Sequence, residues 1–425
     1  MEDISLSKNQ SKVQPLPEKW TSHAIKDLAY LNKANLNNQM NCSVIHYIDI
    51  DSVEEGVIKN IRAIAVKSAP SRAKRIVNDK DILVSSVRPN LKHFCKIRYP
   101  KPCTVASTGF VVLTPKEINP DFLYYSITTK EFTNYLSAIA ETSTTAYPSI
   151  TADVVANYSI ACPPENEQKA IAKILSDLDS KLELNQKMNE TLESIAQAIF
   201  KHWFIDFEFP NEEGKPYKSS GGEMVDSELG KVPKKWAIKT LDGIANFLNG
   251  LALQRYPAIT ENDYLPVIKI KEMNYGISGS SDKASRDIPS EYIVHNGDVL
   301  FAWSGSLGVT IWCNGEGALN QHIFKISSNE YPKWFYYEWL LYYLPNFIEI
   351  ARDKATTMGH IQRHHISESL VAVPDSNTLE IMNNVLKLII DRIINLKVEN
   401  DTLTKTRDLF LPSLISGKIR VPLEG

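Results

Sequence analysis

The chain repeats itself over half its length, and this duplication limits the folds that it can adopt. NETL at 189–192 returns as NDTL at 400–403, 211 residues later. Four further pairs follow the same order: LPEKW (16–20) with VPKKW (232–236), NDKDILVSSVRP (78–89) with HNGDVLFAWSGS (295–306), DFLYYSITTKEF (121–132) with KWFYYEWLLYYL (333–344), and ETSTTAYPSI (141–150) with RDKATTMGHI (352–361). This period far exceeds the roughly 20–50 residues of solenoid repeats, so each copy contains a whole domain.

Each copy ends in a long helical pattern, and a polar stretch separates the copies. The predicted organisation is a first domain at 1–162, a helix at 163–210, a linker at 211–232, a second domain at 233–373, and a C-terminal helix with its tail at 374–425. Gly, Ser, Pro and mixed charges are typical of a surface linker. A chain of 425 residues is expected to hold two or three domains of about 100–200 residues.

The two helical patterns carry a heptad repeat. Apolar residues and Asn recur at alternating steps of four and three from Ile171 to Trp203, and a shift of 211 residues gives the series from Met382 to Leu414. A sustained period of about 3.5 residues is typical of a coiled coil, so we predict that the helices pair antiparallel; packing of each helix on its own domain is the alternative. Polar seam residues can set the register, and about 40 residues would span about 60 Å as a ruler. The predicted spacer residues are Leu178, Leu182, Asn185, Asn189, Leu192, Ile389, Ile393, Leu396, Asn400 and Leu403.

The globular halves mix strands and helices. Strand patterns occur at 44–50, 81–87 and 109–115, with counterparts at 266–273, 297–303 and 322–327. The stretch 119–140 reads as one helix, capped by Asn119 with Pro120 at its first position. The predicted fold class is α+β, with two tandem globular α/β domains, each followed by a long helix, related by a pseudo-two-fold duplication.

A basic segment in the first half suggests a polyanionic ligand. The chain has a net charge of −3, yet residues 59–101 hold twelve Lys and Arg against two Asp. Arg can bridge guanine and Asn can pair with adenine, whereas a solvated surface loop is the alternative reading of 85–93. The second half is less basic, with four basic and five acidic residues over 266–310. The DNA-binding candidates are Lys59, Arg62, Arg72, Lys74, Arg75, Ser85, Ser86, Arg88, Asn90, Lys92, Thr144 and Thr145 in the first copy, and Lys269, Lys271, Ser304, Ser306, Thr356, Thr357 and Arg363 in the second.

Motifs for catalysis, metal binding and membrane insertion are missing from the sequence. It contains no P-loop, H-E-x-x-H or G-x-S-x-G motif, and NPDF at 119–122 lacks the second proline of the amino-methyltransferase motif. We therefore predict no catalytic residue, no metal site and no cofactor bound by this chain. No secretory signal or membrane span is apparent, which leads us to expect a cytoplasmic protein. The five cysteines form no C-x-x-C pair and are expected to be reduced, partly buried thiols.

Two segments carry a resemblance to a known family. PPENEQKAIAKILSDLDSKLELNQKMNETLESIAQAIFKHWFIDF (163–207) and GKPYKSSGGEMVDSELGKVPKKW (214–236) resemble the central region of type I restriction–modification specificity subunits. The resemblance implies two target-recognition domains that each bind half of a split DNA sequence. It also implies helices that set the spacing and dock two methyltransferase subunits, which use S-adenosylmethionine to methylate adenine, and a restriction subunit that uses ATP and Mg²⁺. PDSNTLEIM at 374–382 departs from the acid–glutamine phrase that follows the proline in the family's second helix.

Three functions remain open on the sequence. A non-catalytic DNA-specificity subunit accounts for the repeat, the basic segment and the helices. A coiled-coil scaffold with protein-binding domains would bind partners without salt-sensitive affinity for DNA. A divergent methyltransferase or nuclease acting alone would bind S-adenosylmethionine or cut DNA by itself, and the missing motifs disfavour it.

Overall fold

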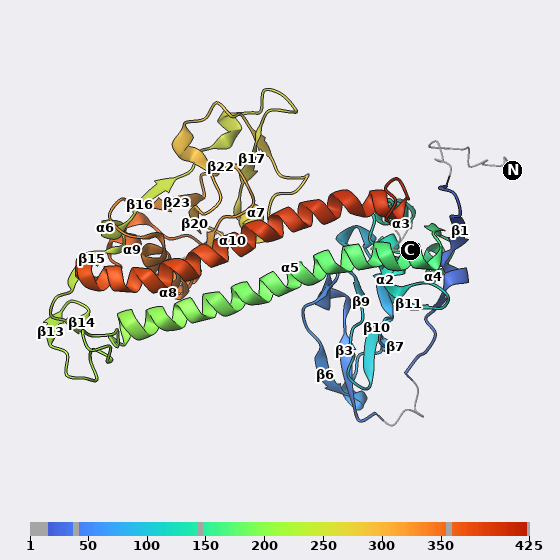
Figure 1. Cartoon of the computed structure of the whole chain (residues 1–425), viewed down its shortest axis with the longest axis horizontal. Coiled ribbons are helices and arrows are strands. Elements are labelled where there is room, and N and C mark those ends of the chain that lie inside the picture. Colours follow the sequence, from blue (N-terminus) through green and yellow to red (C-terminus); the bar gives the residue numbers. More distant parts are fainter. Residues whose placement is uncertain (1–15, 37–41, 143–147, 354–358, 423–425) are drawn as a thin grey trace. The chain divides into compact units, whose positions relative to one another are not determined.

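The computed structural model describes residues 16–36, 42–142, 148–353 and 359–422, and the chain divides into two compact units. The first unit is Met1–Ser180 with Lys405–Gly425, and the second unit is Lys181–Thr404. Helices α5 (Glu165–Phe200) and α10 (Ser376–Ile415) each contribute residues to both units (Figure 1). In the described part of the chain, none of the helices has the length and apolar character that a membrane span requires.

The first unit contains two four-stranded sheets. Its elements are β1 (Thr21–Ala24), α1 (Ile25–Leu28), β2 (Ala29–Leu31), β3 (Val44–Ile48), β4 (Val53–Glu54), β5 (Val57–Ile58), β6 (Arg62–Ala65), β7 (Ala73–Ile76), β8 (Ile82–Ser85), β9 (Phe94–Lys96), β10 (Thr104–Ser107), β11 (Phe110–Pro115), α2 (Pro120–Ile127), α3 (Lys130–Glu141), α4 (Ala152–Ala156) and β12 (Ser159–Cys162). One sheet has the order β6-β3-β10-β7, in which β3 and β10 are parallel. The other has the order β2-β11-β8-β9 and is antiparallel throughout.

The second unit repeats the topology of the two four-stranded sheets. Its elements are β13 (Met224–Ser227), β14 (Gly230–Pro233), β15 (Ala237–Thr240), α6 (Leu241–Ile244), β16 (Asn246–Asn249), β17 (Leu265–Ile268), α7 (Ile270–Tyr275), β18 (Lys283–Ala284), β19 (Ile293–Val294), β20 (Val299–Ala302), β21 (Gly308–Ile311), β22 (Gly317–Leu319), β23 (Ile323–Ser327), α8 (Lys333–Asp353), α9 (Arg363–Ser367) and β24 (Leu370–Val373). The sheets have the orders β18-β17-β22-β19, with β17 and β22 parallel, and β16-β23-β20-β21, which is antiparallel. The pair β15–β24 matches β1–β12. The predicted duplication and α+β composition are therefore confirmed.

Most predicted strands are confirmed, but two segments differ because polar side chains end or start helices there. The helix expected at 119–140 is two helices, α2 and α3, because Thr129 accepts a hydrogen bond from the Phe132 N–H and caps a new helix. Asn119 caps α2 as predicted. The strand expected at 266–273 ends at Ile268, and α7 follows it, with the buried Glu272 carboxylate accepting the Lys269 N–H at 3.2 Å.

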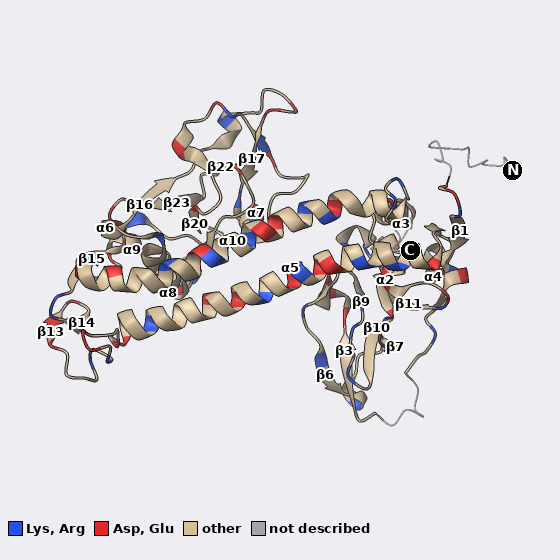
Figure 2. Ribbon diagram, viewed as in Figure 1, with Lys and Arg blue, Asp and Glu red and all other residues tan. Residues whose placement is uncertain are grey.

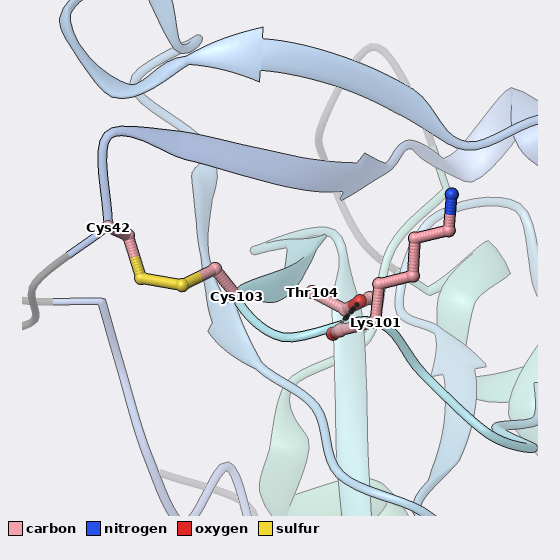
Figure 3. The surroundings of a disulfide bond; sticks show 4 residues. All are labelled: Cys42, Lys101, Cys103 and Thr104. Carbon is pink, nitrogen blue, oxygen red and sulfur yellow. Dashed lines mark hydrogen bonds between the residues drawn. A yellow bond between two sulfur atoms is a disulfide. The ribbon is translucent and has the colours of Figure 1, made fainter.

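The expectation that all five cysteines are reduced is wrong for one pair. Cys42 and Cys103 form a disulfide with their Cα atoms 6.3 Å apart. They lie 61 residues apart in sequence, but Cys42 precedes β3 and Cys103 precedes β10. Because these strands are parallel neighbours, their starts lie side by side, as Figure 3 shows. The remaining cysteines, Cys95, Cys162 and Cys313, are buried free thiols.

Within each unit, α5 and α10 make polar contacts along the predicted seam. In the second unit, the Asn185 amide, which is fully buried, donates to Glu399 Oε2 and Asn400 Oδ1, both at 2.9 Å. In the first unit, Arg407 donates to Asp179 Oδ1 at 3.1 Å. The other predicted spacer residues are buried or half-buried. A polar network at the seam can fix the register between two helices.

The first unit is also held together where its two helix ends meet the N-terminal strand. Glu167, which is 1% exposed, accepts hydrogen bonds from Trp20 Nε1 at 3.1 Å and from Arg420 Nε at 2.6 Å. In the second copy Thr378 stands where the first has Glu167. Trp236 Nε1, the counterpart of Trp20 Nε1, is buried and has no hydrogen-bond partner among the residues that the structure describes. The departure of 374–382 from the acid–glutamine phrase therefore has a structural counterpart.

Candidate nucleic-acid interface

The loop after β8 is held in a strained and specific conformation. In this β8 loop (86–92), Arg88 has φ 47° and Lys92 has φ 54°, both in the left-handed region. A non-glycine residue enters this region at a cost of about 1–2 kcal/mol, so neighbouring bonds must hold it there. Ser85 is one such support, because its buried hydroxyl donates to the Val87 carbonyl at 2.8 Å. Ser85 was predicted to bind DNA, but its buried side chain is not available for such a contact.

The second unit contains the same turn after β20. In this β20 loop (303–307), Gly305 has φ 69° and donates its backbone N–H to the Gly359 carbonyl at 2.9 Å. The backbone N–H of Arg88 donates to the Pro148 carbonyl in the same way, at 2.8 Å. A second backbone hydrogen bond is also equivalent in the two copies. The Ile150 N–H donates to the Ser86 carbonyl at 2.9 Å, and the Ile361 N–H donates to the Trp303 carbonyl at 3.0 Å. The backbone is therefore equivalent at the start of the two loops, up to Arg88 and Gly305, whereas the side chains differ. Beyond Arg88 the β8 loop continues as a short 3-10 helix, Pro89–Leu91.

Arginines from two strands of the first unit meet at one carboxylate. Arg62 at the start of β6 and Arg72 just before β7 donate to Asp49 Oδ2 at 3.1 and 2.9 Å. Asp49 is 8% exposed, and its charge is the main cause that raises the pKa of Arg72 above its ordinary value. Half of each arginine side chain remains exposed, so one buried acid positions two cations at the surface. Figure 2 shows Lys and Arg along this part of the unit.

The other predicted residues of the first copy have varied surroundings. Lys59 and Lys92 form exposed ion pairs with Glu54 and Glu55, and Arg75 donates to Asn35 Oδ1 at 2.8 Å. Ser86 donates to the Gly109 carbonyl at 2.9 Å, while Lys74 and Asn90 are exposed. Thr144 and Thr145 lie outside the described residues. The structure thus brings Ser86, Arg88, Asn90 and Lys92 together on one loop and places the remaining cations on the β6-β3-β10-β7 sheet or beside it.

The predicted residues of the second copy are only partly available. Ser304 is 5% exposed, and its hydroxyl lies 3.1 Å from His322 Nδ1. Lys269 pairs with Asp282, and Lys271 donates to Ser280 Oγ at 3.0 Å. Ser306 and Arg363 are exposed, whereas Thr356 and Thr357 lie outside the described residues. The predicted residues of the second copy therefore offer less positive charge to a DNA ligand than those of the first copy.

Sequence reasoning missed a hollow beside the β20 loop. This Trp303 hollow has a volume of about 330 Å³, and its walls include Asn249, Trp303 and Arg363. Only Arg363 was predicted as a site residue. The signal was present in the repeat, because Trp303 stands where the first copy has Ser86. The replacement of a serine by a tryptophan is unusual here, because the residues that directly follow Trp303 are small or polar.

Comparison with known proteins identifies the family. The family model described as "Type I restriction modification DNA specificity domain" matches residues 17–194 and 233–405. The chain is 26% identical to the type I restriction enzyme HindI specificity subunit of Haemophilus influenzae, over 83% of this chain and 90% of that protein. It is 29% identical to the MjaIX specificity subunit of Methanocaldococcus jannaschii, over 85% and 82%.

A solved structure has a similar fold. It is the type-I restriction-modification system S subunit from M. genitalium, with a TM-score of 0.57, 16% identity, and coverage of 97% of this chain and 98% of that chain. Both matched segments of the family model contain one copy of the duplicated domain with its β8 or β20 loop. The chain therefore belongs to the family of type I restriction–modification DNA specificity domain proteins.

Proposed function

We propose that this chain is the non-catalytic specificity subunit of a type I restriction–modification complex. Each globular domain contacts one half of a split DNA target. The observation that carries this proposal is the pair of equivalent turns, the β8 loop and the β20 loop, on two copies of one framework. A shared backbone turn with different side chains suits two recognition domains that select different sequences.

The paired arginines at Asp49 supply the charge that DNA binding needs. Phosphate contacts by Lys and Arg provide most of the sequence-independent affinity and make it sensitive to salt. A scaffold that binds only proteins, which is the alternative function, has no need for this arrangement. The scaffold function also does not explain why a cationic side chain occupies the strained backbone position of Arg88.

The long helices are assigned a spacing and docking role. We infer that α5 and α10 pair as an antiparallel coiled coil along the predicted seam, and the Asn185 network supports this. The proposed domain boundaries are those expected from the sequence: 1–162, 163–210, 211–232, 233–373 and 374–425. Outside the seam, Ile174 and Val385 occupy equivalent positions, and each is 40% exposed. Such matching apolar side chains suit two methyltransferase subunits that dock on the two helices.

The partners supply the chemistry in this proposal. The methyltransferase subunits bind S-adenosylmethionine and methylate adenine, and a restriction subunit uses ATP and Mg²⁺. This chain contributes the choice of sequence.

Methylation sequencing of cells with and without the gene tests the proposal directly, with the methyltransferase partner retained. We expect one split, adenine-methylated motif to disappear on deletion and to return with a plasmid copy. An unchanged methylation pattern, with the partner expressed and active, would favour the scaffold.

A further inference from the structure

Three strand termini converge at the Trp303 hollow. In the antiparallel order β16-β23-β20, Asn249 pairs with Phe324 and Ala302 pairs with Ile323. The ends of β16 and β20 therefore lie at the same edge as the start of β23. Trp303 follows β20 directly, and its Nε1 donates to Asn249 Oδ1 at 3.0 Å. The indole and the amide are thus fixed against each other.

The walls of the hollow combine aromatic rings with hydrogen-bond donors. Trp303 and Phe324 lie with ring centroids 5.8 Å apart, and His360 meets Trp303 edge-on at 6.5 Å. Arg363 lies over the Phe324 ring, and exposed Gln362 completes the rim. Among the described residues that line the hollow, none is Asp or Glu. The site therefore suits a planar ligand that accepts hydrogen bonds.

Asn249 is the best-placed donor. Its Oδ1 accepts the hydrogen bond of Trp303, while among the described residues its Nδ2 makes one long contact, 3.5 Å to the Gly250 carbonyl. Because Trp303 determines which way the amide faces, Asn249 presents N–H groups rather than a carbonyl to a ligand.

The described residues at the equivalent positions of the first copy are not aromatic. The shared hydrogen bonds and strand pairs place Ser86 at the position of Trp303, and Val111 at that of Phe324. Thr151 precedes α4 as Gln362 precedes α9. The framework is therefore common to both copies, whereas this combination of Trp303, Phe324 and Gln362 is replaced in the first copy by Ser86, Val111 and Thr151.

We propose that the Trp303 hollow recognises a purine of the second half-site. This inference rests on the proposed function and names the groups that select the base. Asn249 Nδ2, the Gln362 amide and the Arg363 guanidinium would face the N7 and 6-position of the purine, and the rings form apolar walls. Cytosine offers no N7 acceptor in the major groove, and the usual partner of its N4 donor is a carboxylate, which the described residues of these walls lack. The second domain thus selects its sequence through hydrogen bonds more than through charge.

The test uses the full chain assembled with its methyltransferase partner and duplexes of its methylated motif. Each purine of the second half-site is replaced in turn by its 7-deaza analogue, which lacks the N7 acceptor. For the wild type we expect affinity to fall about tenfold at one of these positions. Asn249→Asp keeps the acceptor for Trp303 but removes the donor, so its affinity should be equal for the parent and that 7-deaza duplex. Gln362→Ala, at an exposed position, should reduce the same ratio.

Thr151→Ala is the matched control, because it changes the position equivalent to Gln362 in the first copy. It should retain the wild-type ratio at the second half-site. The inference is overturned if no 7-deaza substitution there weakens wild-type binding, or if Asn249→Asp and Gln362→Ala both keep the tenfold difference. Failure of the proposed function is a separate result, in which the wild-type complex shows no preference for any split motif.

Discussion

Arg88 and Gly305 take the same left-handed backbone position in the two copies of one domain, with φ of 47° and 69°. Each donates its N–H to the carbonyl of an equivalent residue, Pro148 or Gly359. Glycine adopts this conformation without steric cost, whereas arginine does not. An arginine at a position where glycine would cost less agrees with the DNA contact proposed for this side chain.

Arg88→Gly should therefore separate DNA recognition from stability. Relief of the left-handed strain and the greater flexibility of the unfolded glycine chain offset each other, so the free energy of unfolding should stay within about 1 kcal/mol of the wild type. Affinity for the first half-site should fall about 5- to 150-fold, which corresponds to 1–3 kcal/mol. Binding to duplexes altered in one half-site at a time measures this loss. Gly305→Ala should affect only the second half-site, and a loss at both half-sites from Arg88→Gly would contradict the assignment.

Lys74 on β7 is expected to contact the DNA backbone. Lys74→Ala should weaken binding by a similar factor for all sequences and reduce the slope of log K against log salt by about one, because one phosphate contact is lost. Titrations at several salt concentrations provide the slope. Lys387→Ala is the control. It removes an exposed lysine of α10 that pairs with Asp391, and it should leave the salt slope unchanged. If Lys74→Ala instead changed the preferred sequence, Lys74 would be a base contact.

Glu338 should make the second unit less stable at alkaline pH. Burial, aided by the charge of Glu193, raises the pKa of Glu338 to about 8. The folded protein therefore retains a proton that the unfolded chain releases, so the free energy of unfolding falls as pH rises from about 4.5 to 8. Glu338→Gln should remove this dependence and stabilise the unit at pH 9 by about 2–5 kcal/mol.

Urea denaturation at pH 5 and pH 9, followed by tryptophan fluorescence, measures the effect, since six of the seven tryptophans lie in the second unit. Glu349→Gln, at an exposed site on the same helix, is the control and should shift neither curve. Equal stabilisation by Glu338→Gln at both pH values would contradict the raised pKa.

The Glu167 network should make the C-terminal tail important for the first unit. Arg420→Ala leaves the buried Glu167 carboxylate with Trp20 as the other side-chain donor of this network, so the first unit should become less stable. Calorimetry should show a lower unfolding temperature. Lys418→Ala removes an exposed cation from the same tail and should have no effect; a similar shift for both variants would mean that tail charge, not this pair, stabilises the unit.

The helices are proposed to set the gap between half-sites. Insertion of one heptad after Lys187 and another after Val398, which are equivalent positions, lengthens each helix by about 10 Å, or about three base pairs. Methylation sequencing should detect both half-sequences with a longer gap. A single four-residue insertion in α5 alone serves as the control, because it disrupts the seam register. A preserved gap in an active complex with both heptads would rule out the spacing role.

Several features were predictable because they depend on neighbours in sequence. The heptad period marked α5 and α10, and Asn119 followed by Pro120 marked the start of α2. The β8 loop could be located because a buried strand precedes a cluster of basic residues. The 266–273 stretch was mispredicted because the carboxylate of Glu272 caps a helix that strand periodicity does not reveal.

The repeated phrases and periods determined by themselves that the chain has two copies of an α+β domain, each with a long helix. Only the tertiary structure decided which residues meet: Arg62 and Arg72 at Asp49, Cys42 beside Cys103, and Asn249 against Trp303. Local conformation depends on side chains a few positions apart, which the sequence displays directly. These meetings depend instead on strand order and direction, which bring together residues separated by tens of positions.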